Sequence, residues 1–510
     1  MPMAAIFSLF VVTGFRGVDF GYHWDEVEAQ IKPVQQMVST GLLFPRASGY
    51  PGFSKWLTLL PAVPVGLKAV IDNKSDPRLV QAAMLAKVDG PGFLLTARRL
   101  YIVFSAFAIV CVWAAALSLR RPWWEATVAA AGVGLSWEYA YHARWVATDC
   151  PLVVFSALTL FMLALYFRGQ RPLWLYVAAV AAGFATGAKY QGVVLIVPVL
   201  LAGVLTMPSG RAGGHLTLRL VALCAVAFAA FLITTPETVI DPFANWEELL
   251  RISQYYETGH FGYTVSGAWQ HLWLVLIYLS VSFFSPYKAV ALALFASAVA
   301  GAVGYVRSDR RLGVVLVCFP IAFLLFFCGK YHTMIVRNYL LVAPFLALFA
   351  ARGLYEIGTR LPRWWLRWSL AGLVAVAFLG GGAWWLIFAA QSVRHRNPEE
   401  EVRDALAYVG KHPRTRFELS PRVTSLAKLQ QLPVPPNAQA AADADEVVFF
   451  PRAEGIDIFH WKTNDPWLTK AVFGPLEVNF NWYSTWQGPD RVVVMTKDKA
   501  ELAAGVWFVK

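Results

Sequence analysis

Long apolar runs separated by short charged turns occupy most of residues 1–390. A helix that crosses a bilayer needs about 20 mainly apolar residues. The pattern predicts about eleven such helices, at 1–15, 99–118, 122–140, 150–167, 173–188, 191–207, 217–235, 286–306, 312–329, 338–355 and 368–390. Two further apolar stretches, 56–71 and 270–285, are ambiguous because Pro61 and Pro64 interrupt the first and Ser285-Pro286 closes the second.

The composition agrees with a polytopic α-helical membrane protein. The chain of 510 residues is 57% hydrophobic and 15% charged, with a mean hydropathy of +0.50. An average soluble domain carries about 25% charged residues, so an ordinary soluble enzyme and a disordered chain are both excluded. The five cysteines lack the spacing of a disulfide framework or a zinc site.

The basic residues indicate which side of the membrane each loop faces. Lys and Arg number 44 against 32 acids. We assume that 56–71 and 270–285 lie in the membrane interface rather than span. The loops on one side of the membrane are then rich in arginine, from Arg120 through Arg219 to Arg367. The positive-inside rule makes that side, with the N-terminus, cytoplasmic. Loops 16–98 and 235–285 are then extracytoplasmic, as is the C-terminal tail. Because the positive-inside pattern accounts for the excess of basic residues, we expect no nucleic-acid partner.

The tail from 392 to 510 differs in pattern from the rest. An amphipathic helix is expected at 402–409, and strands at 446–450, 491–495 and 506–509. We therefore expect two domains: a transmembrane catalytic domain over 1–391 and a small extracytoplasmic α/β domain over 392–510.

The first extracytoplasmic loop opens with an acidic pair in "HWDEVE". Asp25 and Glu26 follow His23, about ten residues beyond the first predicted span. Adjacent carboxylates at a membrane face can activate a hydroxyl or hold a cation. The same charges would also suit the first turn of a helix over 25–40, so both interpretations stay open.

Further charged residues lie at predicted helix ends on the same side. His142, Arg144 and Asp149 crowd one turn, where Asp149 could cap the next helix and Arg144 could anchor at the interface or pair with Asp149. Lys189, followed by Tyr190, ends a helix, where the dipole favours a cation. The positive-inside rule depletes lysine on that side, which favours a functional role.

Two more extracytoplasmic segments add candidates. The segment 329–340 holds three cationic or ionisable groups beside a tyrosine: Lys330, Tyr331, His332 and Arg337. An arginine fork matches a phosphate bidentately. The loop 235–264 contributes His260 and Tyr263, and it would serve equally as a lid over a cleft or as a structural cover. Together the residues suit transfer from a lipid-linked phosphate to an acceptor outside the cytoplasm.

Five segments in order over about residues 1–360 carry a family resemblance: "HWDEVE", "YPGFSKWL", "HARWVATDCP", "GAKYQG" and "RNYLLVAPFLALFAARG". They resemble the polyprenyl-phosphate-sugar-dependent membrane glycosyltransferases of the GT-C class, in the branch of the protein O-mannosyltransferases (glycosyltransferase family 39) and the lipid A aminoarabinose transferases. The resemblance implies a polyprenyl-monophosphate sugar donor, inversion at the anomeric carbon, and a lipid, glycan or protein acceptor.

The same resemblance assigns roles by position. Asp25 would be the catalytic base, supported by Glu26, and Asp149 a second active-site carboxylate. The donor phosphate would be bound by Lys189, Arg337 and Arg144. The remaining residues would contact substrate: His23, His142, Tyr190, His260, Tyr263, Lys330, Tyr331 and His332.

The chain also departs from the family patterns. It has no DxD-type pair, and "HWDEVE" lacks the following His of the O-mannosyltransferase signature, which leaves metal use and a protein acceptor open. No cofactor is indicated. We expect a bacterial inner-membrane protein with its active site in the periplasm. A lipid or sugar transporter is the alternative, but it would place ionisable residues midway along spans and show two similar halves.

Overall fold

The computed structural model describes residues 2–16, 18, 26–42, 44–45, 49–72, 76–90, 92–207, 213–259, 264–281, 283–285, 288–377, 382, 386, 398–438, 444–449, 471–473 and 492–496. The chain divides into two compact units, and Ala390–Lys510 belongs to the second.

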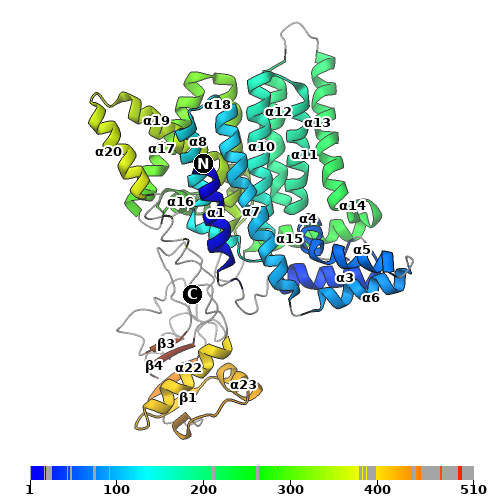
Figure 1. The fold of residues 1–510 in the computed structure, drawn as a ribbon, viewed down its shortest axis with the longest axis vertical. Coiled ribbons are helices and arrows are strands. Elements are labelled where there is room, and N and C mark those ends of the chain that lie inside the picture. The colour runs from blue at the N-terminus through cyan, green and yellow to red at the C-terminus, as the bar shows by residue number, and fades with distance from the viewer. Residues whose placement is uncertain are drawn as a thin grey trace. The chain divides into compact units, whose positions relative to one another are not determined.

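The named elements of the first unit are all helices within the described residues (Figure 1). Its helices are α1 (Pro2–Phe15), η1 (Val27–Ile31), α3 (Lys32–Thr40), α4 (Phe53–Leu59), η2 (Leu60–Ala62), α5 (Val63–Asp72), α6 (Pro77–Val88), α7 (Phe93–Ser118), α8 (Trp123–Gly134), α9 (Trp137–His142), α10 (Asp149–Gly169), α11 (Pro172–Ala188), η3 (Tyr190–Leu195), α12 (Ile196–Leu205), α13 (Gly213–Thr234), α14 (Glu237–Ile240), α15 (Pro242–Thr258), α16 (Ala268–Val281), α17 (Lys288–Ser308), α18 (Arg310–Lys330), η4 (Val336–Val342), α19 (Ala343–Arg360) and α20 (Trp364–Ala375).

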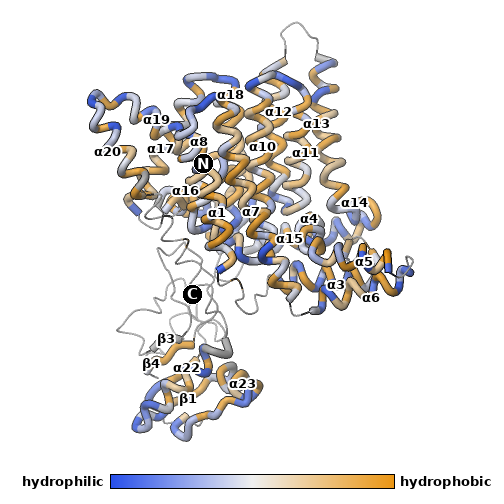
Figure 2. The backbone as a smooth tube through the Cα atoms, in the orientation of Figure 1, coloured by the Kyte–Doolittle hydropathy of each residue, from blue (hydrophilic) through white to orange (hydrophobic). Residues whose placement is uncertain are grey.

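Seven helices among the described residues are long and apolar enough to cross a membrane: Phe53–Asp72, Phe93–Ser118, Asp149–Gly169, Gly214–Thr234, Lys288–Ser308, Arg310–Lys330 and Val336–Arg360. Shorter apolar helices cover Pro2–Phe15, Pro172–Ala188 and Tyr190–Leu205, which are also predicted spans. Figure 2 shows apolar residues along the lengths of α10 to α13 and hydrophilic ones near their ends. The prediction of a polytopic helical membrane protein is confirmed.

Two predicted segments differ in detail from the structure. The single helix expected at 122–140 is broken into α8 and α9, because the Ser136 side chain accepts a hydrogen bond from the Tyr139 amide and starts a new helix. The ambiguous stretch 56–71 forms α4, η2 and α5, a continuous helical segment long enough to span. In Figure 1, α3, α5 and α6 run across the direction of α10 to α13, as expected of interfacial helices.

Close packing of α17 against α19 depends on two glycines. A Cβ atom built on Gly301 would lie 1.9 Å from the carbonyl oxygen of Phe349, and one on Gly353 would lie 1.8 Å from that of Ser297. Small residues let helix backbones approach closely where the surrounding lipid gives no hydrophobic drive to associate. The orientation of α19, and of η4 that precedes it, is therefore fixed by this contact.

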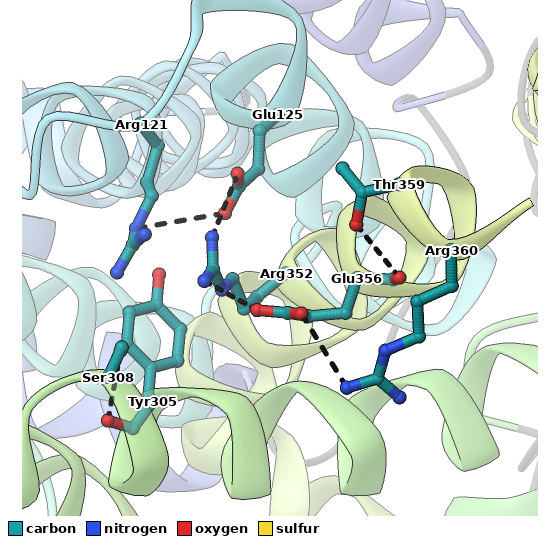
Figure 3. Close-up of polar contacts among 8 residues, drawn as sticks. All are labelled: Arg121, Glu125, Tyr305, Ser308, Arg352, Glu356, Thr359 and Arg360. Atoms are coloured by element: carbon teal, nitrogen blue, oxygen red, sulfur yellow. Dashed lines mark hydrogen bonds and ion pairs between the residues drawn. The ribbon is translucent and has the colours of Figure 1, made fainter.

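A cluster of charged residues connects α8, α17 and the C-terminal half of α19, away from η4 (Figure 3). Arg352 pairs with Glu356 at 2.5 Å and lies 3.9 Å from the fully buried Glu125. Arg121 lies 3.9 Å from the same carboxylate, and its guanidinium stands 4.8 Å from the ring centre of Tyr305. These contacts hold the end of α19 that lies away from η4.

The second unit contains a four-stranded sheet of order β1-β2-β4-β3, from β1 (Phe417–Leu419), β2 (Glu446–Phe449), β3 (Ala471–Phe473) and β4 (Val492–Thr496). Strands β1 and β2 are parallel and the other pairings are antiparallel. The remaining elements are α22 (Pro398–Lys411), α23 (Pro421–Leu429) and η6 (Pro436–Ala438). The predicted strands at 446–450 and 491–495 correspond to β2 and β4, while the one at 506–509 lies outside the described residues.

Candidate functional site

Three residues predicted separately from the sequence meet in the structure. Asp149 begins α10, Lys189 follows the last residue of α11, and Arg337 lies in η4. The Lys189 Nζ lies 2.7 Å from Asp149 Oδ1, and the Arg337 Nε lies 3.7 Å from Asp149 Oδ2. Asp149 and Lys189 are buried, and the Arg337 side chain is 13% exposed. Two cations thus surround one carboxylate where three helical segments begin or end.

A fourth member of this cluster was missed by sequence reasoning. The Lys189 ammonium also donates to Asn338 Oδ1 at 2.7 Å, and Asn338 is buried. We refer to Asp149, Lys189, Arg337 and Asn338 as the ionic cluster. The only signal for Asn338 in the sequence is its place next to Arg337, since a neutral amide in an apolar run is also common as a structural residue.

Hydrogen bonds of His271 connect α16 to η4, next to the Asn338 of the ionic cluster. His271 Nδ1 lies 2.6 Å from the Tyr331 carbonyl oxygen, so this nitrogen must carry the proton and donate. In the neutral imidazole the other ring nitrogen, Nε2, accepts from the hydroxyl of Tyr339, the residue after Asn338. Both side chains are fully buried, and neither was singled out from the sequence.

An apolar cavity of about 630 Å³ opens beside the ionic cluster. Its walls come from α11, η3, α12, α13, α15 and α18, and they include Phe228, Phe231, Leu249 and Phe327. Four predicted site residues line it: Lys189, Tyr190, Lys330 and Tyr331. Lys189 therefore belongs both to the ionic cluster and to the cavity wall.

Polar contacts lie around the cavity wall. Tyr190 donates its hydroxyl to Asn245 Oδ1 of α15 at 3.4 Å. The Lys330 Nζ lies 3.3 Å from Glu257 Oε1 and 5.3 Å from the centre of the Tyr331 ring. Hydrogen bonds from Ser253 and Lys330 hold the pKa of the Glu257 carboxyl below its usual value. Contacts of α15 with residues at the ends of α11 and α18 therefore tie loop 235–264 to the bundle.

His332 is held through its backbone, whose amide donates to the Tyr256 carbonyl at 2.9 Å and whose carbonyl accepts from the Val265 amide at 2.8 Å. This arrangement ties the segment before η4 to the end of α15 and to the strand-like stretch that follows. The structure thus positions the main chain of His332, while a substrate contact by its ring stays a prediction.

Glu26 is held by an arginine that sequence reasoning missed. Arg98 of α7 donates from Nε to Glu26 Oε1 at 2.9 Å and from Nη2 to Oε2 at 2.5 Å. The Val146 amide donates to Oε1 at 2.9 Å. The fully buried carboxylate therefore ties the first loop to the turn that leads into Asp149. His23, Asp25, His260 and Tyr263 lie outside the described residues.

Arg144 and His142 are also buried. The Arg144 guanidinium donates to the backbone carbonyls of Ala140, Thr13 and Leu386, at 3.2, 3.0 and 3.3 Å. These bonds join α1 and α9 to the chain at Leu386, rather than anchoring the arginine at a lipid interface. The His142 Nε2 lies 3.5 Å from Glu138 Oε2.

The described residues include no group of three or more His, Cys, Asp or Glu side chains that could hold a metal ion. The five cysteines are free thiols.

Comparison with known proteins gives a family match. Residues 83–239 match the family described as "Dolichyl-phosphate-mannose-protein mannosyltransferase". This stretch contains Asp149 and Lys189, two members of the ionic cluster. The resemblance to the GT-C class of membrane glycosyltransferases is thereby confirmed. No match is found among curated proteins.

Several solved structures are similar over most of the chain. ArnT from Cupriavidus metallidurans bound to undecaprenyl phosphate shares 15% identity, covers 97% of each chain and gives a TM-score of 0.49. The archaeal oligosaccharyltransferase AglB from Archaeoglobus fulgidus, in complex with an inhibitory peptide and a dolichol-phosphate, shares 12% identity over 87% of this chain and 61% of that one, with a TM-score of 0.47. The resemblance to the GT-C class rests on the family match over residues 83–239.

Proposed function

We propose that this protein transfers a sugar from a polyprenyl-monophosphate carrier to an acceptor hydroxyl at the extracytoplasmic face of the membrane. The observation that carries the proposal is the double position of Lys189. It belongs to a buried ionic cluster that suits a phosphate, and it lines an apolar cavity that suits a polyprenyl chain. A lipid-linked phosphate needs both environments at adjoining positions.

The ionic cluster has the electrostatics required of a leaving-group site. Asp149 keeps the two cations close together and paired. A bound phosphate would take up part of that positive charge, and the cations would stabilise the charge that develops as the phosphate departs. Burial strengthens this effect, because water screens the interaction less.

The base of the reaction is Asp25. The acceptor oxygen attacks the anomeric carbon with inversion, the bond from that carbon to the phosphate oxygen breaks, and the hydroxyl proton passes to Asp25. The polyprenyl phosphate leaves with the bonding electron pair. A general base of this kind contributes about 10²–10⁴-fold to the rate. In support, Glu26, the next residue, is bonded to the Val146 amide, three positions before Asp149.

Sidedness follows from the same cluster. Its members come from the start of α10, the end of α11 and the segment between α18 and α19, so these ends lie together. The positive-inside pattern assigns the opposite loops to the cytoplasm. This supports an extracytoplasmic site, in the periplasm of a bacterial cell.

The test is transfer from a panel of polyprenyl-phosphate sugars, labelled in the sugar, by the purified protein. Asp25→Asn is expected to abolish transfer while polyprenyl phosphate still binds. Lys189→Met is expected to weaken both steps, and Lys68→Met, which changes an exposed lysine of α5, should affect neither. Turnover by Asp25→Asn at the wild-type rate would reject the proposal. Lipid movement across vesicles without transfer would instead favour a transporter.

A further inference from the structure

We propose that Asn338 binds the donor phosphate directly, through its side-chain Nδ2. This inference rests on the proposed function, since it assumes a polyprenyl-phosphate donor at the ionic cluster. It adds a neutral hydrogen-bond donor to a site for which the sequence suggests only charged phosphate ligands.

The orientation of the Asn338 amide follows from its neighbour. Lys189 carries an ammonium group, which donates hydrogen bonds and accepts none. The Asn338 atom that lies 2.7 Å from Lys189 Nζ must therefore be the carbonyl oxygen, Oδ1. The Nδ2 group then points away from Lys189 with two protons to donate.

Nδ2 has no hydrogen-bond partner within the described part of the protein, although Asn338 is only 1% exposed. A buried polar group left without a partner costs about 1–3 kcal/mol, so such groups usually mark a ligand or an ordered water. The neighbouring residue in the chain is Arg337, a second member of the ionic cluster. An unpartnered donor thus lies where an anion is expected.

The spacing fits one phosphate group. The oxygen and nitrogen of an amide are about 2.2 Å apart, so Nδ2 lies no more than about 4.9 Å from Lys189 Nζ. Two oxygens of a single phosphate can therefore accept from the two groups at once. Lys189 already gives two of its three protons to Asp149 and Asn338. Lys189 can then offer a phosphate one hydrogen bond, and Asn338 supplies another.

The alternative is that Asn338 only orients Lys189. A double-mutant cycle separates the two roles, because a residue that acts only through Lys189 has no effect once that lysine is gone. Asn338→Leu keeps the approximate shape of the side chain and removes the amide. It is compared in the wild-type protein and in Lys189→Met, with binding of a polyprenyl monophosphate as the measurement. The polyprenol of equal length, which lacks the phosphate, is the matched ligand.

Asn338→Leu is expected to weaken binding of the polyprenyl phosphate about 10-fold or more in both backgrounds, as loss of a hydrogen bond to a charged group does. Binding of the polyprenol should stay within about 2-fold of wild type, because the lost bond goes to the phosphate. Asn338→Ser, smaller and polar, is the second variant should Asn338→Leu fail to fold, and the same loss is expected. Absence of any effect in the Lys189→Met background would overturn the inference. If the wild-type protein bound both lipids equally, the proposed function itself would fail, whatever the variants did.

Discussion

Removal of the Lys189 ammonium should lower both the stability of the protein and the rate of transfer, and a second substitution should restore only the stability. In Lys189→Met, Asp149 would lose its 2.7 Å partner and keep only Arg337 at 3.7 Å, while Asn338 Oδ1 would lose its donor. Breaking a buried pair by removing one partner costs about 3–5 kcal/mol, because the other charge stays buried. Loss of one group that stabilises a developing charge costs about 10²–10³ in turnover.

The double variant Asp149→Asn/Lys189→Met removes both charges. Its thermal stability should recover most of what Lys189→Met loses, since no unpaired carboxylate remains, while transfer stays at the level of the single variant. Thermal unfolding in detergent and transfer of labelled sugar are measured on the four proteins of the cycle. The reasoning is refuted if the two substitutions are additive in stability, or if the double variant regains turnover.

Three further outcomes are expected. A bound polyprenyl phosphate should protect Cys224, an exposed thiol in the cavity wall, from a membrane-permeant maleimide, and equal labelling with and without lipid would place the chain elsewhere. Gly353→Leu should cost several kcal/mol and abolish transfer, because the side chain would overlap the Ser297 carbonyl, whereas Gly372→Leu should fold normally. Burial raises the pKa of the Glu237 carboxyl, so the wild-type protein loses stability as pH rises through that value. The Tm of Glu237→Gln relative to wild type should therefore be about 1–2 °C higher at pH 7 than at pH 4. An equal Tm difference at the two pH values would contradict this.

The membrane architecture was largely predictable from the sequence because hydrophobic length is a strong signal. A run of apolar residues must be satisfied by a helix that buries its own backbone hydrogen bonds. The break between α8 and α9 was not predicted, because Ser136 is one polar residue inside an apolar run. In the second unit, β1 and β3 are three residues each, too short to show an alternating pattern.

The charged candidate residues were selected from the sequence for a different reason. Charge on the side that the positive-inside rule depletes needs a cause, and Lys189 and Arg337 were selected in this way. That they share Asp149 could not be read from the chain. Lys189 lies 40 positions from Asp149 and 149 positions from Asn338, the residue after Arg337, and these residues meet only through packing of α10, α11 and η4. The fold supplies the partners, and the sequence supplies only the candidates.

Arg144 and Arg98 show that charge alone does not identify the partners of a buried arginine. Both lie near ends of predicted spans that the positive-inside rule predicts to be extracytoplasmic. Of the two, the family resemblance implied a phosphate-binding role for Arg144 alone. In the structure the Arg144 guanidinium donates to three backbone carbonyls, and Arg98 holds Glu26. A buried arginine has five donors, and the groups that satisfy them depend on tertiary contacts. The useful criterion is therefore the remaining capacity of a buried polar group after its protein contacts are counted. By that criterion Asn338 Nδ2 is the group in the ionic cluster best placed to receive a ligand that the protein itself does not provide.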